Sequence, residues 1–482
     1  MPRSRRPFTA HDCLRLQACS DPQLAPDRRM LAWVRTWADA ERNGYQAQLM
    51  LTSLTSGTSQ ALTAAPLVAA QPRWSPDGQT LAYVATTPRS SAPQLYTIPA
   101  SGGTPRQLTT IRGGVVQPTW SPEGQSISLQ PLVYPPPPPA ATPYERFTRD
   151  ILVTQQPLVA HQSWGQPSHC VVVTLHGEPK VSIIPITLED AALSRTLTPI
   201  ETPCSGICNL QSTIVNGISP CQAPAVAASQ AYTWPSIGDQ IMLAACHDTA
   251  GHALIALLAD QFNPGDLYLL HADTAAQRLT TLNAGLLNEL LLAPCLRFSH
   301  SKTQGWVIPP QGYCSGQRYP AILDLRPHPP SFKPAWQTYA AQGYAVICGE
   351  GVAHQAAFEL VAAACASYPF IDPKRIVIIG GPDVVHVAET QPTYPLIADC
   401  RQQPHLTPEL HLKAKPRATL VLATSNHYAG EQLYTSLGQR GVAVELVRLP
   451  STNHPLLPAL RPWHHVFALE RCLAWLNRAG GL

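Results

Sequence analysis

The sequence has few charged residues, no cluster of positive charge and no long apolar run. Asp, Glu, Lys and Arg make up 13% of the 482 residues, and the formal net charge is only +3. Without a run of Lys and Arg we expect no phosphate-binding surface and no nucleic-acid partner. No stretch reaches the roughly 18 apolar residues that a membrane-spanning helix needs, and the basic N-terminus lacks the apolar segment of a secretory signal. The sequence therefore predicts a cytoplasmic protein with no membrane partner.

The chain also lacks the cysteine spacing of a disulfide framework or a zinc site. Its 13 cysteines are odd in number and scattered, which is typical of reduced, buried thiols. The one cluster, Cys204 and Cys208 followed by Cys221 and Cys246-His247, is looser than the paired C-x₂-C of zinc sites. We expect no metal and no cofactor.

Apolar residues and proline are abundant. Hydrophobic residues account for 45% of the chain, and its 50 prolines are about twice the average frequency, which favours short helices, turns and edge strands. A length of 482 residues exceeds one ordinary core and predicts about two to three domains. Five consecutive prolines, Pro135 to Pro139, are typical of polyproline II, and we interpret them as a stiff surface loop.

The first half of the chain contains a repeat. "QPRWSPDGQTLAYVA" (71–85) and "QPTWSPEGQSISLQP" (117–131) are one unit displaced by 46 residues, and "DPQLAPDRRMLAWVR" (21–35) is a weaker copy. Ser75 and Pro76 suit the start of a type I turn that Gly78 closes. A repeat of this length, with alternating apolar residues after a turn, is typical of propeller blades. We expect a β-propeller-like domain over residues 10–295, with degenerate blades at about 140–260.

From Gln304 onward the pattern changes. Short apolar runs such as "GWVIPP", "YPAILDL", "GYAVICG" and "RIVIIGG" alternate with helical or loop segments. This alternation predicts a mostly parallel sheet covered by helices, because both faces of a parallel sheet are normally buried. We expect an α/β domain over residues 300–482. The predicted fold class is an all-β, propeller-like N-terminal domain plus an α/β C-terminal domain.

The order of these blocks resembles the prolyl oligopeptidase family, in its acylaminoacyl-peptidase or dipeptidyl-peptidase-like branch. The resemblance covers about residues 8–130 and 262–478, in blocks such as "SDPQLAPD", "WSPDG", "DLYLL", "AAQGYAV", "YPFIDPKRI" and "VELVRLPSTNH". It implies that the C-terminal domain is of the α/β-hydrolase type. It also implies a Ser, Asp and His triad that cleaves short peptides admitted past the propeller.

The nucleophile turn of that family is altered in this chain. Where the resemblance places G-G-S-x-G-G, the sequence reads "GGPDVV", with Pro382 at the lost nucleophile position and Val384 and Val385 in place of glycines. A nucleophile elbow is a strained turn whose central residue has a positive φ, whereas proline is restricted to about −65°. We predict that the elbow does not form.

The other catalytic parts implied by the resemblance are also incomplete. The oxyanion loop H-G-G-P reads "RPHP" (326–329), and proline has no backbone N–H for an oxyanion. The segment "TSNHYAGEQLY" lacks the expected aspartate, and we expect Glu431 to face solvent on the helix that follows. His454, in "LPSTNHPLL", occupies the position of the catalytic histidine, and we interpret it as vestigial. Weaker candidates are His427, His464 and His465.

Three residues near predicted strand ends are alternative nucleophiles, although none lies in a glycine-flanked turn: Ser425, Cys400 and Asp383.

The sequence therefore predicts a catalytically impaired or inactive homologue of a propeller-gated serine peptidase, acting as a binding or assembly subunit. Its expected partners are peptides or a related active subunit, in a homo- or hetero-oligomer. One alternative is an active serine hydrolase for short or N-acylated peptides with a rebuilt site. A single sequence also leaves open a chain under no selection for function.

Overall fold

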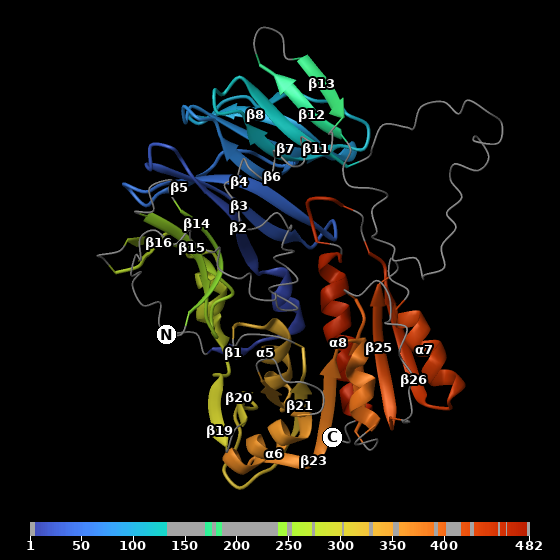
Figure 1. Ribbon diagram of the computed structural model, residues 1–482. Helices are drawn as coiled ribbons and strands as arrows, with labels where there is room; N and C mark the ends of the chain where they lie inside the picture. Colours follow the sequence, from blue (N-terminus) through green and yellow to red (C-terminus); the bar gives the residue numbers. More distant parts are fainter. Residues whose placement is uncertain are drawn as a thin grey trace, which may run out of the picture. The chain divides into compact units, whose positions relative to one another are not determined.

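The protein divides into two compact units, and each is described by itself. A computed structural model (Figure 1) describes residues 5–132, 169–175, 180–185, 240–247, 253–271, 275–300, 303–326, 331–349, 356–389, 394–401, 416–424, 429–451, 454–458 and 460–479. By spatial proximity, residues 1–65 group with 201–482, and residues 66–200 form the second unit. The domain limits 10–295 and 300–482 stay predictions.

An eight-stranded sheet forms the C-terminal part of the first unit. The strand order is β19-β20-β22-β21-β23-β24-β25-β26. Strand β20 is antiparallel to both neighbours, and all other neighbouring strands are parallel. The strands are β19 (Leu296–His300), β20 (Thr303–Ile308), β21 (Tyr319–Asp324), β22 (Ala345–Cys348), β23 (Ile371–Gly380), β24 (Leu396–Asp399), β25 (Ala418–Thr424) and β26 (Ala443–Leu449).

Helices cover both faces of this sheet. One face packs against α6 (Ala357–Ser367), the short helix η3 (Pro382–Glu389) and α7 (Ala429–Gln439). The other packs against α5 (Pro334–Ala341) and α8 (Pro462–Ala479). Coverage on both faces explains why the central strands read as continuous apolar runs, such as the buried residues 376–380. The predicted α/β domain is confirmed.

Two four-stranded antiparallel sheets in the first unit have the form of propeller blades. They pack on each other through Trp33 and Leu31 of one and Ile255 and Leu257 of the other. Gln17 and Asn283 also exchange two hydrogen bonds of 2.9 Å between backbone and side-chain amide. The strands are β2 (Gln17–Leu24), β3 (Met30–Asp39), β4 (Gly44–Ser53) and β5 (Ser59–Ala61), then β14 (Ile241–His247), β15 (Ala253–Ala259), β16 (Asp266–His271) and β17 (Gln277–Arg278).

The second unit contains two more sheets of the same kind. Adjacent sheets are joined by a hydrogen bond from the Gln117 backbone N–H to Gln71 Oε1 at 2.7 Å, and by one from Trp120 Nε1 to the Arg73 carbonyl at 3.0 Å. The strands are β6 (Val68–Trp74), β7 (Thr80–Thr87), β8 (Ser90–Pro99) and β9 (Arg106–Gln107), then β10 (Val115–Trp120), β11 (Ser126–Pro131), β12 (His169–Thr174) and β13 (Lys180–Pro185).

The three sequence repeats share one backbone irregularity. Asp21, Gln71 and Gln117 all have a positive φ, between 45° and 56°. Each lies where the pairing of the first two strands of its sheet shifts register, as in a β-bulge. The same bulge at corresponding positions shows that the weak copy at 21–35 is a true blade repeat.

The turn after the bulge also forms as the sequence predicts. The Gly78 backbone N–H donates to the Ser75 carbonyl at 2.9 Å, and Gly78 has φ of 70°. The Ser75 hydroxyl accepts from the Thr80 backbone N–H at 3.0 Å. Gly78 adopts the left-handed conformation without steric strain, and the Ser75 hydroxyl links the turn to the next strand by its hydrogen bond.

The N-terminal residues pack against the α/β part rather than joining a blade. Strand β1 (Arg6–Pro7) pairs with β18 (Leu290–Leu291), which follows helix α4 (Ala284–Glu289). The short helix η1 (Ala10–Leu14) places Ala10 in the core beneath α5 and α8. Residues 6–14 thus help to close the α/β core.

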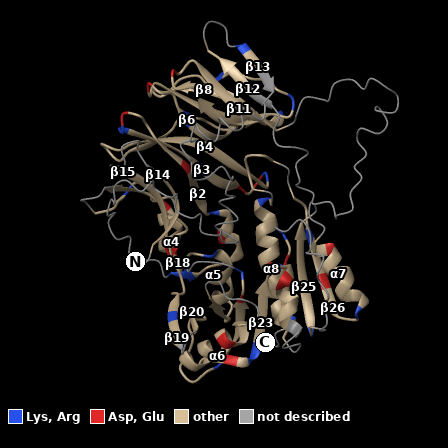
Figure 2. Ribbon diagram, in the orientation of Figure 1, with Lys and Arg blue, Asp and Glu red and all other residues tan. Residues whose placement is uncertain are grey.

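Several expectations concern residues that the structure does not describe or features that it does not show. The proline run 135–139 and Cys204, Cys208 and Cys221 lie outside the described residues. Within the described ranges there is no group of three His, Cys, Asp or Glu side chains able to hold a metal, and no helix long and apolar enough to cross a bilayer. Figure 2 shows the two signs of charge interspersed and sparse along the strands.

Two glycines of α7 should respond in opposite ways to alanine. A Cβ at Gly430 would lie 2.4 Å from the Cβ of Ala423 on β25, so Gly430→Ala should lower the free energy of unfolding by about 1–3 kcal/mol. A Cβ at Gly438 would meet only Val444, at 3.9 Å, so Gly438→Ala should be neutral or stabilise by up to about 1 kcal/mol. Urea unfolding of both variants measures the contrast, and equal effects would contradict the close approach of α7 to β25.

Candidate functional site

The C-terminal ends of the parallel strands meet at one edge of the sheet, where ligands bind in open α/β folds. Pro382 follows β23, His454 follows β26, and the loop that should supply an acid follows β25. Strands β21 and β24 end on the same edge, because both are parallel to β23. This edge is the candidate site, and its side chains show what chemistry it can support.

The turn after β23 does not have the shape of a nucleophile elbow. The strand ends at Gly380, and η3 begins at Pro382, with the Val384 backbone N–H donating to the Gly381 carbonyl at 3.1 Å. No residue from 376 to 389 has φ in the left-handed region, and Pro382 itself is buried. The strain that presents a nucleophile at the top of such a sheet is therefore not built here.

Valine occupies the space where the resemblance places a small residue. A Cβ added to Gly380 would lie 2.8 Å from both Cβ and Cγ2 of Val384. Val384 and Val385 are both buried in the core on that face of the sheet. The start of η3 is thus fixed by apolar packing against the strand end.

His454 lies after β26 as the sequence predicts, and its hydrogen bonding differs from that of a catalytic histidine. Its Nδ1 accepts a hydrogen bond from the Leu456 backbone N–H at 3.2 Å. Burial lowers the pKa of His454, which favours the neutral ring. A neutral imidazole that accepts at Nδ1 carries its proton on Nε2. In a Ser-His-Asp triad the roles are reversed, since Nδ1–H donates to the acid and Nε2 takes the serine proton.

The remaining predicted site residues are not brought together as a triad within the described part of the chain. Glu431 lies on α7, partly exposed, with Oε1 3.1 Å from Arg448 Nε. Asp383 is exposed on η3, whereas Cys400 is buried and burial raises its thiol pKa. Residues 327–330 and 425–428, which include Pro327, Pro329, Ser425 and His427, lie outside the described residues.

A buried ion cluster lies at the same edge, and its first half comes from β21. Asp324, the last residue of that strand, accepts from Arg326 Nε at 2.9 Å and from Arg326 Nη2 at 2.6 Å. The Trp336 indole of α5 donates to the same carboxylate at 2.9 Å. The resemblance puts the oxyanion loop directly after β21, so a guanidinium paired to a carboxylate stands at the start of that loop.

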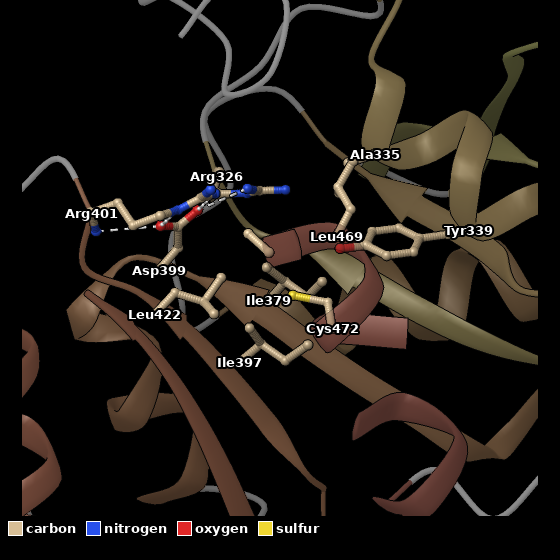
Figure 3. A pocket seen from close by; sticks show the side chains of 11 residues that line it. Arg326, Ala335, Tyr339, Ile379, Ile397, Asp399, Arg401, Leu422, Leu469 and Cys472 are labelled. Atoms are coloured by element: carbon tan, nitrogen blue, oxygen red, sulfur yellow. Dashed lines mark hydrogen bonds and ion pairs between the residues drawn. The ribbon is translucent and has the colours of Figure 1, made fainter. Parts of the chain in front are cut away.

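The second half of the cluster comes from β24. Asp399 accepts from Arg401 Nε at 2.8 Å and Nη2 at 2.7 Å, and from Arg326 Nη1 at 3.1 Å. Although burial by itself raises it, Arg401 and Arg326 hold the pKa of Asp399 well below its usual range. Arg326 therefore bridges two strand ends through two carboxylates, as the dashed contacts in Figure 3 show for Asp399.

Two further ionisable side chains are buried beside this cluster. Lys333 precedes α5 and is 3% exposed; burial and the charge of Arg326 lower its pKa to about 8. His465 on α8 is 5% exposed; burial, Arg401 and His464 lower its pKa to about 3. Neither ring nitrogen of His465 makes a hydrogen bond within the described residues, although the backbone of Leu460 is close enough to raise its pKa slightly.

The sequence analysis missed the carboxylates of this cluster. Both strand ends carry the same D-x-R pattern, Asp324-Leu325-Arg326 and Asp399-Cys400-Arg401. A paired Asp and Arg directly after two apolar runs would have indicated charged groups at one sheet edge. Strand β24 is only four residues long. Its apolar run is too short to be recognised as a strand from periodicity, so its D-x-R pattern could not be placed at a strand end.

The N-terminal part of the chain is similar in sequence to a known type of propeller domain. Residues 16–130 match the model of the TolB β-propeller domain. Over 95 residues, 20% of this chain and 14% of the relative, the sequence is 37% identical to the uncharacterized peptidase YuxL of Bacillus subtilis. The chain thus matches only a small part of that curated relative.

Solved structures resemble the chain over nearly its whole length. An acylaminoacyl peptidase of Pyrococcus horikoshii aligns with a TM-score of 0.70 and 12% identity, over 98% of this chain and 97% of that one. The AtxE2 isopeptidase aligns at 0.61 and 14%, over 99% and 96%. A prolyl endopeptidase aligns at 0.54 and 13%, over 98% and 91%. The chain has the propeller plus α/β-hydrolase fold of prolyl oligopeptidase-family peptidases, which confirms the predicted resemblance and fold class.

Removing the Asp399 carboxylate, which Arg326 and Arg401 share, should lower the free energy of unfolding. Asp399→Asn leaves Arg326 and Arg401 without their common counter-charge in a buried site, so we expect a loss of about 3–5 kcal/mol in the free energy of unfolding. The control Glu431→Gln breaks an exposed ion pair and should cost about 1 kcal/mol or less. Urea unfolding compares the two, and similar losses would show that the cluster is not buried as described.

His465 should make the protein sensitive to mild acid. The pKa of His465 is lower in the folded than in the unfolded state. Its contribution to the free energy of unfolding is therefore fully present above about pH 6.5 and is lost as the pH falls toward 3. The expected slope is at most about 1.4 kcal/mol per pH unit. His465→Leu should flatten the stability profile between pH 6.5 and 5, where few carboxylates titrate.

The matched control for His465→Leu is His464→Leu, which changes the neighbouring residue of α8. Burial lowers the pKa of His464 also, but this side chain is less buried, so His464→Leu should flatten the profile less. Chemical unfolding at several pH values measures both slopes. A His465→Leu profile parallel to that of the unaltered protein would rule out a buried neutral histidine.

Proposed function

We propose that the protein is a non-catalytic relative of the propeller-gated serine peptidases, with an α/β-hydrolase domain that acts in binding or assembly. The observation that carries this proposal is the turn after β23, where a buried proline starts a helix and no residue adopts a positive φ. Serine chemistry needs a nucleophile exposed at that point. The accepting Nδ1 of His454 supports the same conclusion, because it opposes the proton path of a triad.

The proposed partners are peptides or a related active subunit. The fold is shared with an acylaminoacyl peptidase and a prolyl endopeptidase, whose names indicate peptide substrates. A domain that loses the chemistry while its sheet and helices persist is suited to holding such a peptide or pairing with a similar domain. Calorimetric titration with N-acylated dipeptides and native mass measurements, alone and with an active relative, distinguish the two kinds of partner.

A fluorophosphonate probe tests whether any activated serine exists. We expect no covalent labelling of the purified protein under conditions that label an active serine peptidase completely. Labelling that reaches one probe per chain would support the alternative, an active hydrolase with a rebuilt site. Mass spectrometry of the labelled peptide would then identify the serine, with Ser425 as the first to inspect.

Restoring the nucleophile alone should not restore activity. Pro382→Ser supplies a hydroxyl, but Val384 still packs on Gly380 and His454 still accepts at Nδ1, so we expect no turnover of acyl-peptide or amino-acyl ester substrates. His454→Ala should change the free energy of unfolding by about 1 kcal/mol or less. Saturable turnover by Pro382→Ser that disappears in the double variant with His454→Ala would mean that the site is only switched off.

A further inference from the structure

Basic side chains gather at the edge of the C-terminal sheet where its parallel strands begin, opposite the candidate site. Tyr319 of β21 pairs in register with Ile371 of β23, and Ala418 of β25 pairs with Ala443 of β26. With β24 between them, these strand starts extend over about 19 Å at the usual strand spacing. The residues at this edge, called here the basic edge, are Arg318, Lys374, Arg375, Arg417 and Arg440.

The strand order brings these five residues together from distant parts of the sequence. Arg318, Arg417 and Arg440 lie one to three residues before β21, β25 and β26. Lys374 and Arg375 lie in β23 directly before Ile376, which pairs with Ala321 near the start of β21. Arg375 is half-buried, and the other four are exposed. The sequence shows no run of basic residues here, so the basic edge is visible only in the folded chain.

The basic edge has little counter-charge within the described residues. Asp372 is the one carboxylate in the described segments that begin these strands, and its Oδ1 accepts from the Lys374 backbone N–H at 3.0 Å. None of the five basic side chains forms an ion pair within the described part of the chain. Glu445 of β26 is engaged by Arg471 and Arg478 of α8. The basic edge therefore attracts negative charge from solution.

An exposed aromatic side chain adjoins the basic edge. Tyr313, in the loop before β21, is 47% exposed, and its ring centroid lies 5.0 Å from that of Phe370. Phe370 directly precedes β23 and packs in turn on Tyr368, with ring centroids 5.6 Å apart. Phe370 and Tyr368 are half-buried, so Tyr313 has the most accessible ring of the three. This ring is suited to contact with an apolar side chain of a partner.

Carboxylates fit this surface better than a nucleic acid does. Four of the five basic residues are arginines, whose guanidinium groups pair with carboxylates in bidentate geometry. Phosphates are bound in the same way, but proteins that bind single strands also stack successive bases on several exposed rings. In the described aromatic cluster only Tyr313 is exposed. A single ring beside several arginines is better matched to a peptide with acidic residues and one apolar residue.

We propose that the basic edge and Tyr313 bind an acidic segment of a partner protein. The arginines pair with its carboxylates, and the Tyr313 ring packs against one of its apolar side chains. The basic edge lies at the opposite ends of the strands from Pro382 and His454, so this interaction goes beyond the proposed function and does not rest on it. Labelling by a fluorophosphonate would overturn the proposed function and leave this interaction untouched.

Fluorescence anisotropy of a labelled peptide tests the charge. The probe consists of Glu and Ser residues with one central Phe, and a second peptide has Gln in place of Glu. The unaltered full chain should bind the Glu peptide only, and more weakly as salt is added. Loss of four contacts should weaken this binding at least about tenfold. The edge variant that removes them combines Arg318→Gln, Lys374→Gln, Arg417→Gln and Arg440→Gln.

The matched control changes the net charge by the same amount on the blades. Its four exposed arginines form no ion pair within the described residues, and it should bind the Glu peptide as the unaltered protein does. Urea unfolding checks that the control and the edge variant are both folded. The control combines Arg29→Gln, Arg89→Gln, Arg106→Gln and Arg112→Gln.

Tyr313→Ser tests the aromatic contact separately from the charge. It should weaken binding of the Glu peptide about fivefold, and should not affect a Glu peptide in which Ser replaces the Phe. The control Tyr434→Ser, on an exposed tyrosine of α7, should leave both affinities unchanged.

Three outcomes would overturn the proposal. The first is no binding of the Glu peptide, or binding that the edge variant retains. The second is an equal loss in the edge variant and its control, which would show an effect of net charge alone. The third is tighter binding of oligothymidylate or of phosphatidylglycerol vesicles than of the Glu peptide, abolished in the edge variant, which would assign the basic edge to a nucleic acid or a membrane instead.

Discussion

The parallel sheet of the C-terminal part places a strong constraint on where polar chemistry can lie. Its central strands are covered by helices on both faces, so charged side chains are confined to the strand ends. In this protein that edge is occupied by Asp324, Arg326, Asp399 and Arg401, which pair with one another across β21 and β24. Carboxylates that are fully engaged with arginines are not available as the acid of a triad, nor as a general base.

The differences from a serine-hydrolase site extend beyond the position of Pro382. Arg326 stands at the end of β21, on the edge that would have to present backbone N–H groups to an oxyanion, and it is bound to two carboxylates there. On the next strand, Val384 packs on Gly380 and turns η3 into part of the core. Both features are compatible with a stable fold, and together they make the described part of this edge packed rather than strained.

Local sequence patterns predicted the fold well, but they did not predict contacts between side chains far apart in the sequence. The Ser-Pro-Asp-Gly turn at 75–78 and the 46-residue repeat predicted blades because turn chemistry and alternation act over a few residues. Pro382 likewise marks its own turn, since its φ is fixed by its ring. The contact between Arg326 and Asp399 joins residues 73 positions apart, and nothing in either D-x-R pattern says that β24 lies near β21. Only the strand order brings them together.

Buried ion pairs alone are weak evidence of stability, because desolvation offsets much of the attraction. Their value here is better understood as geometric: one guanidinium holds two strand ends at a fixed separation, and Trp336 fixes α5 to the same carboxylate. Such a network is satisfied only in one arrangement, so it specifies that arrangement. An active hydrolase needs this edge open to substrate, whereas a binding or assembly subunit needs it rigid. The cluster is therefore physically consistent with the proposed binding or assembly role, which depends on a fixed shape.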